Sequence, residues 1–312
     1  MTDTKDQKLS RAEIDCAYRL LLGRQANPAE LDHMLARGHT HDSLRRVFMS
    51  SAEFQRKAGN VQRPGPGANA TAPERAKTLI HLHVPKSAGS TLTSILAPTC
   101  PQAGRMTISD NDLQRLKVLP QQRRSELRFV FGHLSYGVGR LLPQDCAYIT
   151  VLREPGTRLL SYFRYIQRVT DHPLHGPVSQ KQMNFGDFLE YAAATPVARL
   201  EPDNGQVRRL AGFGARIDSL GTEDQLFRQA LHNIFSEDVV YGLTEHFDDF
   251  LDRLTRRKII SHYSDARLNT APEKTDIAPI LEGLTGRQKE IFETFTRWDR
   301  TFYEICKTAY FA

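Results

Sequence analysis

Beyond residue 77, short apolar segments alternate with longer amphipathic ones, and this alternation restricts the fold more than any other feature. Residues 78–84 are rich in apolar side chains and end at Pro85, which is typical of a buried strand. Three further strands are expected, at residues 128–131, 145–152 and 239–243. Because helical segments separate the strands, the pattern predicts an α/β fold with a parallel sheet covered on both faces. The helices are expected at residues 90–96, 110–119, 155–169, 185–193, 223–235, 246–257 and 287–308.

The segment before this pattern is organised differently. Residues 59–73 consist largely of Pro, Gly and small residues without apolar periodicity, as in a linker. Before them, Ser10 can cap a first helix that ends at Gly23, Pro28 opens a second, and residues 43–54 predict a third. We therefore predict a small all-α module at 1–58, a Pro/Gly-rich linker at 59–76 and an α/β domain at 77–312.

Composition excludes several classes of protein. The 312 residues are 40% hydrophobic and 25% charged, which argues against wholesale disorder. No segment approaches the roughly 18 uninterrupted apolar residues of a membrane span, and the first ten residues lack the apolar core of a secretion signal. We expect a cytoplasmic protein, with peripheral membrane association left open. The net charge of +6 suits an anionic ligand, and equally a plain basic surface.

Metal ligands and disulfides are not expected. The four cysteines, Cys16, Cys100, Cys146 and Cys306, are isolated, with no C-x-x-C pair and no His/Cys cluster at zinc spacing. Reduced and mostly buried thiols are favoured. No cluster of carboxylates resembles a magnesium site, so we expect no metal.

The most informative stretch is His83-Val-Pro-Lys-Ser-Ala-Gly-Ser-Thr-Leu92. The predicted strand enters a tight turn at Gly89, and a helix begins near the hydroxyls of Ser90 and Thr91. Such a turn directs backbone N–H groups and the positive end of a helix at one point, and Lys86 adds a mobile charge. The pattern therefore predicts an anion site. An ordinary strand–turn–helix connection with a solvated lysine is the alternative.

A second candidate anion site lies in Val151-Leu-Arg-Glu-Pro-Gly-Thr-Arg-Leu-Leu-Ser-Tyr-Phe163. Arg153 follows a predicted strand, Pro155 suits the first turn of a helix, and Ser161 lies about two turns along it. The planar guanidinium and the hydroxyl can converge on a phosphate. The alternative is an arginine that pairs with Glu154 at the helix start.

The two motifs together resemble those of sulfotransferases that use 3′-phosphoadenosine 5′-phosphosulfate (PAPS). The stretch Pro85-Lys-Ser-Ala-Gly-Ser-Thr91 resembles their 5′-phosphosulfate loop, and Arg153-Glu-Pro followed by Arg158-Leu-Leu-Ser-Tyr162 resembles their 3′-phosphate motif. The carbohydrate sulfotransferases that include the heparan 2-O-sulfotransferases are the most similar group. The resemblance covers about residues 77–308 and implies a P-loop-like α/β fold. It implies that PAPS contacts Lys86, Ser87, Ala88, Gly89, Ser90, Thr91, Arg153 and Ser161.

Weaker matches support the same family. Residues 131–134 resemble the Gly-His turn that carries its catalytic base, and residues 203–212 resemble its Asn-x-Gln-x-Arg-x-Leu-x-Gly segment. Residues 240–248 and 268–274 resemble its late helix start and its donor-covering loop. Residues 87–88 are Ser-Ala where Thr-Gly is common. No segment matches a known acceptor-binding insertion, so the acceptor is left open.

Sulfuryl transfer needs a group that stabilises charge on the leaving phosphate and a base that removes the acceptor's proton. Lys86 suits the first role, and His133, which follows a strand and a glycine at the ligand-facing edge, suits the second. A structural turn histidine is the alternative for His133, and Glu154 is the backup base. His81 and His83, in the first strand, are expected to be hydrogen-bonded core histidines.

The sequence thus predicts a PAPS-dependent O-sulfotransferase acting on a carbohydrate hydroxyl, such as that of a bacterial surface polysaccharide or a lipid-linked sugar. A P-loop kinase is disfavoured because G-x-x-x-x-G-K-[ST] is absent, and a non-catalytic anion- or glycan-binding module stays open. No nucleic-acid partner is expected. Residues 18–24, with 48 and 51–54, resemble a small helical module of unknown function from bacterial proteins, which assigns no chemistry.

Overall fold

The computed structural model describes residues 8–22, 24–40, 43–44, 47–48, 51, 53, 77–212, 223–261 and 276–312. The chain separates into two compact units, Met1–Pro73 and Glu74–Ala312. The expected linker at 59–76 and the expected donor-covering loop at 268–274 lie outside the described residues.

The N-terminal unit contains the helices α1 (Arg11–Leu22) and α2 (Pro28–Ala36). The side chain of Asn27 caps α2 and accepts a hydrogen bond from the backbone of Glu30, whose carboxylate bonds back to the backbone of Asn27. The apolar faces of the unit share a buried cluster that consists of Leu9, Ile14, Tyr18, Leu22, Leu31, Leu44 and Phe48. Half of the third predicted helix, at 43–54, lies outside the described residues.

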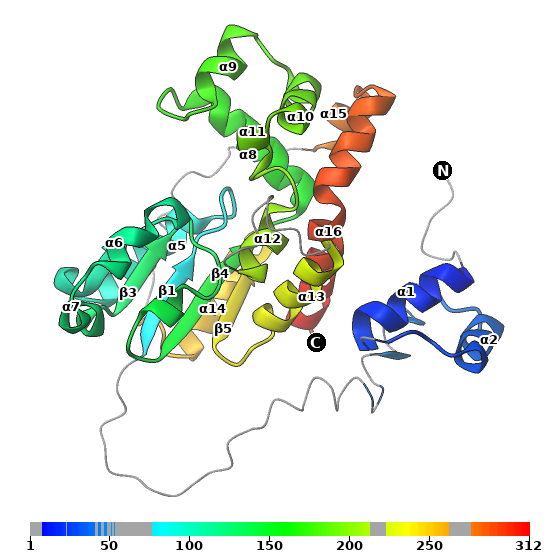
Figure 1. Cartoon of the computed structure of the whole chain (residues 1–312), viewed down its shortest axis with the longest axis horizontal. Coiled ribbons are helices and arrows are strands. Elements are labelled where there is room, and N and C mark those ends of the chain that lie inside the picture. The colour runs from blue at the N-terminus through cyan, green and yellow to red at the C-terminus, as the bar shows by residue number, and fades with distance from the viewer. Residues whose placement is uncertain are drawn as a thin grey trace, which may run out of the picture. The chain divides into compact units, whose positions relative to one another are not determined.

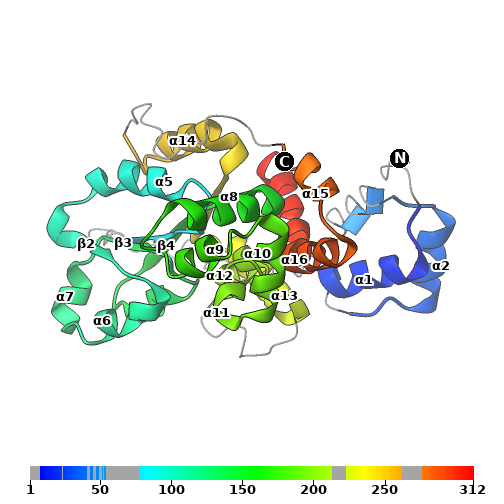
Figure 2. The ribbon, with the colours of Figure 1, turned by 90° about the horizontal axis from the view of Figure 1, so that it is seen from above.

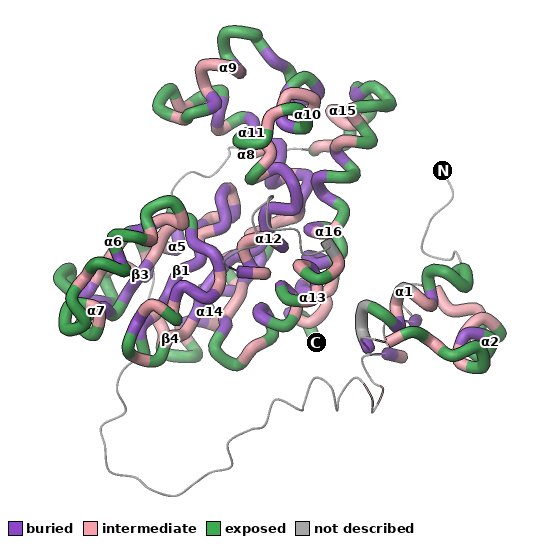
Figure 3. Tube along the Cα trace, in the orientation of Figure 1, coloured by how far each residue is buried: buried purple, intermediate pink, exposed green. Residues whose placement is uncertain are grey.

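The second unit is built on a sheet of five parallel strands, which confirms the α/β prediction (Figure 1). The strands are β1 (Thr78–Leu82), β2 (Arg105–Thr107), β3 (Phe129–Gly132), β4 (Cys146–Leu152) and β5 (Val239–Leu243), in the order β2-β3-β1-β4-β5. The central strands β1 and β4 are almost continuously buried, as expected of a sheet covered on both faces (Figure 3). Sequence analysis missed β2, because three residues with one arginine show no alternation.

Helices cover both faces of the sheet (Figure 2). One face carries α5 (Gly89–Leu96) and α14 (Phe247–Arg256), whose Leu92 and Phe250 share a buried cluster with Ile149 of β4. Figure 2 shows α6 (Leu113–Lys117), α7 (Gln121–Glu126) and α13 (Glu223–Ile234) on the other side.

The remaining described helices of this unit form a second group. It comprises α8 (Pro155–Arg168), α9 (His175–Gln180), α10 (Phe185–Ala194), α11 (Pro196–Arg199), α12 (Gly205–Ala211), α15 (Ala278–Glu282) and α16 (Gly286–Tyr310). Phe163, Phe188 and Phe295 belong to the buried cluster that joins α8, α10 and α16. Among the described residues, no helix combines the length and the apolar character needed to cross a membrane.

Short 3-10 turns complete the chain at η2 (Ala97–Thr99), η3 (Gln102–Gly104), η4 (Asp110–Asp112), η5 (Val138–Leu141) and η6 (Thr244–His246). The helix expected at 110–119 is η4 followed by the shorter α6. The short helices α7, α9, α11, α12 and α15 were not predicted, because one or two turns leave too few residues for a helical period.

A buried ion pair joins α8 to α16. Arg158 is 1% exposed, and its Nη2 donates to Oδ2 of Asp299 at 3.3 Å and to the carbonyl oxygen of Glu201 at 3.0 Å. The Asp299 carboxylate also accepts hydrogen bonds from the backbone N–H groups of Gln206 and Val207, at the start of α12. Arg158 therefore holds together three helices through one carboxylate.

We predict that Arg158→Leu lowers the free energy of unfolding by about 3–5 kcal/mol, because it leaves Asp299 buried without its cation. Arg300→Leu, which removes an arginine from an exposed pair with Glu293, is the control and is expected to cost about 1 kcal/mol or less. Chemical denaturation of the three proteins measures both values. Equal losses for the two variants would show that Arg158 does not join these helices.

Candidate functional site

The site lies where three neighbouring strands end. Strand β1 pairs in parallel with β3 on one side and with β4 on the other. Their carboxyl ends therefore meet at one edge of the sheet, which is where open α/β sheets bind ligands. His133 follows β3, the loop with Lys86 follows β1, and Arg153 follows β4.

The loop after β1 has an unusual backbone. Lys86 and Ala88 have φ values of 67° and 56°, in the left-handed region that residues with a side chain seldom occupy. No side-chain hydrogen bond caps the start of α5, and the positive end of this helix meets the loop. Within the described part of the chain, Oγ of Ser87 is buried and has no hydrogen-bond partner. These features are expected of a main-chain anion site.

Gly89 is required by the close approach of His83. A Cβ atom at position 89 would lie 1.9 Å from Cδ2 of the His83 ring. The same ring lies edge-on to His133, with 4.8 Å between the centroids, and stacks on His81 at 5.5 Å. Burial lowers the pKa of His83 to about 2, so this imidazole is neutral. His83 thus packs between the start of α5 and the candidate base.

Lys86 and Arg153, predicted from separate motifs, lie next to each other. Nη1 of Arg153 donates to the carbonyl oxygen of Lys86 at 3.0 Å. Nζ of Lys86 lies 4.1 Å from the centroid of the Tyr165 ring, a cation–π contact. Burial, together with the charges of Arg168 and Arg153, lowers the pKa of Lys86 to about 8. A dianionic ligand between these cations would relieve their repulsion.

The other residues of the second motif have separate tasks. The Glu154 carboxylate accepts hydrogen bonds from the backbone N–H groups of Gly156 and Thr157, at 2.8 and 2.7 Å, and so caps α8. This engagement makes Glu154 a poor candidate for the base. Ser161 lies on α8, is partly exposed, and makes no hydrogen bond to Arg153.

Charged residues from other parts of the chain lie close to His133. The backbone N–H of Asp110 donates to the His133 carbonyl oxygen at 3.1 Å, and its carboxylate accepts from the Ser135 N–H and hydroxyl at 2.9 and 2.5 Å. Arg209 pairs with Glu201 and lies 4.0 Å from Asp110. His133 is exposed to solvent. The protein around the imidazole removes part of its hydration, and this desolvation, followed by the charge of Arg209, lowers the pKa of His133. The imidazole is therefore neutral at pH 7, as a base must be.

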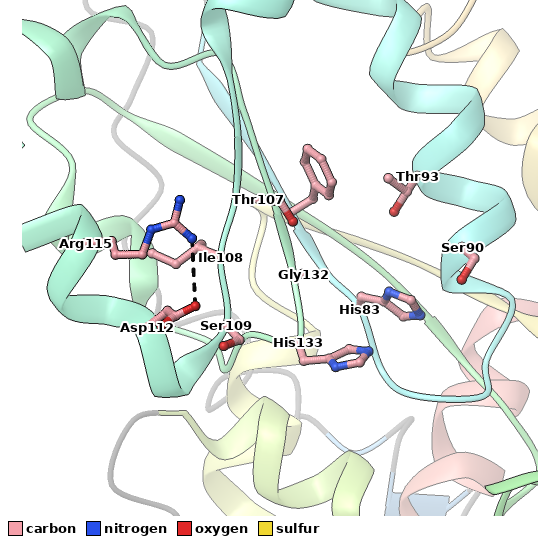
Figure 4. Close-up of a pocket in the computed structure, with 11 residues that line it drawn as sticks. His83, Ser90, Thr93, Thr107, Ile108, Ser109, Asp112, Arg115, Gly132 and His133 are labelled. Carbon is pink, nitrogen blue, oxygen red and sulfur yellow. Dashed lines mark ion pairs between the residues drawn. The ribbon is translucent and has the colours of Figure 1, made fainter. Parts of the chain in front are cut away.

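A cavity of about 450 Å³ opens beside the two histidines (Figure 4). His83 and His133 form one end of it, and Figure 4 shows Asp112 and Arg115, paired at 3.8 Å, on the opposite side. Phe131 supplies an aromatic surface. The remaining lining includes the hydroxyls of Ser90, Thr93, Thr107 and Ser109. Hydroxyl groups beside an aromatic ring are suited to a polar, uncharged ligand.

The structure thus brings together most of the predicted site residues. Lys86 to Thr91 form the loop, with Ser90 exposed and Ser87, Gly89 and Thr91 buried, and Arg153 contacts the loop. His81 is a buried core histidine, hydrogen-bonded to Thr93, as expected. His83, expected in the core, instead lines the cavity.

Sequence reasoning missed the charged residues that lie close to His133. Asp110 and Glu201 carry no local motif, because they reach the site from distant parts of the chain. Arg209 belongs to the matched segment 203–212, and the pair Arg208-Arg209 is typical of a solvated surface, yet the Arg209 side chain is mostly buried and pairs with Glu201. Among the described residues, no group of three or more His, Cys, Asp or Glu side chains is arranged to hold a metal ion.

Comparison with known proteins agrees with this geometry. Residues 71–213 match the model of the Sulfotransferase family. Heparan sulfate 2-O-sulfotransferase 1 of Gallus gallus is 27% identical over 195 residues, 55% of this chain and 52% of that protein. The same protein of Pongo abelii is 27% identical over 210 residues, 60% of this chain and 56% of its own length. Within its α/β domain the chain is therefore similar to sulfotransferases, and it spans about half the length of these curated relatives.

Among solved structures, the crystal structure of mouse sulfotransferase SULT7A1 complexed with PAP is 16% identical. It aligns with 76% of this chain and 90% of its own, with a TM-score of 0.39.

We predict that Gly89→Ala lowers the free energy of unfolding by about 1–3 kcal/mol, because the added methyl group must displace the His83 ring. Gly176→Ala, at a position with open space around the added atom, is the matched control and should be neutral or stabilising. Thermal and chemical denaturation measure the difference. A Gly89→Ala protein as stable as the control would mean that His83 does not rest on the loop.

Proposed function

We propose that this protein is an O-sulfotransferase that moves a sulfuryl group from PAPS to a hydroxyl of a carbohydrate. The hydrogen bond between Arg153 Nη1 and the Lys86 carbonyl oxygen carries the proposal, because it joins the two segments that we interpret as anion-binding motifs. A ligand with phosphate at two positions matches such a pair of motifs better than a ligand with one. The match of residues 71–213 to the sulfotransferase family model supports the same donor.

The residues have distinct roles in the proposed reaction. The bond between sulfur and the bridging oxygen of the phosphosulfate breaks as a bond forms between sulfur and the acceptor oxygen. Negative charge develops on the leaving phosphate, where Lys86 and the N–H groups at the start of α5 stabilise it. His133 takes the proton of the acceptor hydroxyl, and its neutral state at pH 7 suits that task. Arg153 and Ser161 bind the 3′-phosphate.

The cavity beside His133 is the proposed acceptor site. Its hydroxyl groups and the Phe131 ring suit a sugar, which offers hydrogen bonds at its edges and an apolar face. The two curated relatives are named as heparan sulfate 2-O-sulfotransferases, which supports a carbohydrate acceptor. The resemblance of the N-terminal module to bacterial modules favours a bacterial surface polysaccharide or a lipid-linked sugar as the acceptor. A cytoplasmic site of action is part of the same proposal.

Donor binding tests the proposal directly. The product 3′-phosphoadenosine 5′-phosphate should raise the melting temperature of the protein more than AMP or ATP does at equal concentration. Transfer of radiolabelled sulfate from PAPS to a bacterial glycan extract should then identify the acceptor. Equal shifts from the three nucleotides would contradict the proposed donor. Donor binding without transfer to any glycan would favour a non-catalytic anion-binding module.

We predict that Lys86→Ala weakens donor binding and slows transfer, because the Lys86 cation interacts with the donor phosphate both in the bound complex and in the transition state. His133→Ala should bind the donor as the unmodified protein does and lose about 100-fold or more in rate. Calorimetric binding and initial rates separate the two outcomes. Near-full turnover by His133→Ala would remove His133 from the mechanism.

The pH profile checks the same two roles. With a pKa of about 8, the cation of Lys86 is present below pH 8 and lost above it, so kcat/KM for the donor should fall as the pH rises through 8. The lowered pKa of His133 places the acid limb of kcat/KM below pH 6.5. The bound donor favours the imidazolium, so the acid limb of kcat should lie at higher pH than that of kcat/KM. The high-pH limb should disappear in Lys86→Ala.

A further inference from the structure

Gln206, in the segment 203–212, clamps the backbone of Arg153 by bonding both its N–H and its carbonyl oxygen. Its Nε2 donates to the Arg153 carbonyl oxygen at 2.9 Å, and its Oε1 accepts from the Arg153 N–H at 3.0 Å. The side chain is fully buried. A primary amide that bonds both groups of one residue fixes that residue as a neighbouring strand would.

This clamp acts at the point where the chain leaves the sheet. Arg153 lies between the end of β4 at Leu152 and the start of α8 at Pro155. Its guanidinium reaches the Lys86 carbonyl oxygen, in the loop after β1. A change in the backbone angles of Arg153 would swing a long side chain, so the position of the guanidinium depends on the clamp.

Gln206 is itself held by the buried ion pair of the fold. Its backbone N–H donates to Oδ2 of Asp299 at 3.1 Å, and the next N–H, of Val207, donates to Oδ1 at 2.8 Å. Arg158 neutralises the same carboxylate. The backbone of the first turn of α12 is therefore fixed to α16, and the Gln206 side chain extends from this fixed turn to Arg153.

Asn204 fixes the other end of this turn by entering the hydrogen-bond ladder of α16. Its backbone N–H and its Nδ2 donate to the carbonyl oxygens of Phe295 and Thr294, at 2.8 and 3.0 Å. Its Oδ1 accepts from the N–H groups of Trp298 and Asp299, at 2.8 and 3.1 Å. These are groups that a regular helix would pair with each other, so Asn204 is wedged between two turns of α16.

We propose that Gln206 is a positioning residue for recognition of the donor's 3′-phosphate, acting by fixing the backbone of Arg153. The inference rests on the proposed function, since it concerns a phosphate of PAPS. Asn204 and Asp299 connect the clamp to α16, so the conformation of one buried turn sets the direction of the arginine that meets the ligand. A glutamine that only stabilised the fold would affect all nucleotides alike.

The test compares Gln206→Met with the unmodified protein, because methionine keeps the length of the side chain and removes both bonds to Arg153. The probes are 3′-phosphoadenosine 5′-phosphate and AMP, which share the 5′-phosphate and differ in the 3′-phosphate. Calorimetry gives a dissociation constant for each. Gln229→Met is the matched control, because this glutamine is exposed on α13 and its amide donates to Asn233.

We expect Gln206→Met to weaken binding of 3′-phosphoadenosine 5′-phosphate about tenfold or more, with the dissociation constant of AMP changed much less. Gln229→Met should keep both constants. Equal weakening of both probes, or full preference for the 3′-phosphate in Gln206→Met, would overturn the inference while leaving the proposed function in place. An unmodified protein without that preference would overturn the proposed function and the inference with it.

A second variant covers the case in which Gln206→Met does not fold. Gln206→Glu keeps an oxygen to accept from the Arg153 N–H and loses the donor to the Arg153 carbonyl when it is ionised. Burial raises the pKa of this carboxyl, so the preference for the 3′-phosphate is measured across a pH series. We expect the variant to lose the preference where its carboxyl is ionised and to recover part of it at lower pH, where a protonated carboxyl can donate again. Full preference at a pH at which the carboxyl is ionised would overturn the inference.

Discussion

The parallel pairing of β1 with β3 and β4 is the constraint on which the whole site depends. It gathers His133, the Lys86 loop and Arg153 at one edge, although they come from three separate parts of the sequence. The left-handed backbone at Lys86 and Ala88 turns the loop itself toward this edge of the sheet. Strain of this kind, stored in the left-handed region, persists only where the surroundings hold it, and Gly89 and His83 pack against this loop.

Burial of charge accounts for much of the remaining architecture. Arg158 and Asp299 are both about 1% exposed, and their pairing is stable only because backbone N–H groups of α12 satisfy the carboxylate as well. The same pair determines where Gln206 lies and, through it, where Arg153 lies. At the site, burial and then the charges of Arg168 and Arg153 lower the pKa of Lys86, and this group of cations prepares the loop for an anion. Structural and functional charges thus belong to one connected arrangement.

The sequence predicted the local parts of the fold and site well. Strand β5 was predicted at its observed bounds, and the apolar run before Pro85 with Gly89 after it located the loop. Strand β2 and the short helices carry too few residues for a period to show. Glu154 was a reasonable backup base in the sequence, yet its carboxylate caps α8. His83 was expected in the core, and it lines the cavity because the strand ends one residue before it.

By itself, the sequence determined the fold class and the residue types at each strand end, since apolar periodicity and turn chemistry are local properties of the chain. Only the tertiary structure decided which of those residues meet. The contact of Arg153 with Lys86, the clamp of Gln206 on Arg153 and the surroundings of His133 each join residues far apart in the chain. Such pairs are selected by the order of the strands and by the packing of α16 against α12, and neither leaves a periodic trace in the sequence.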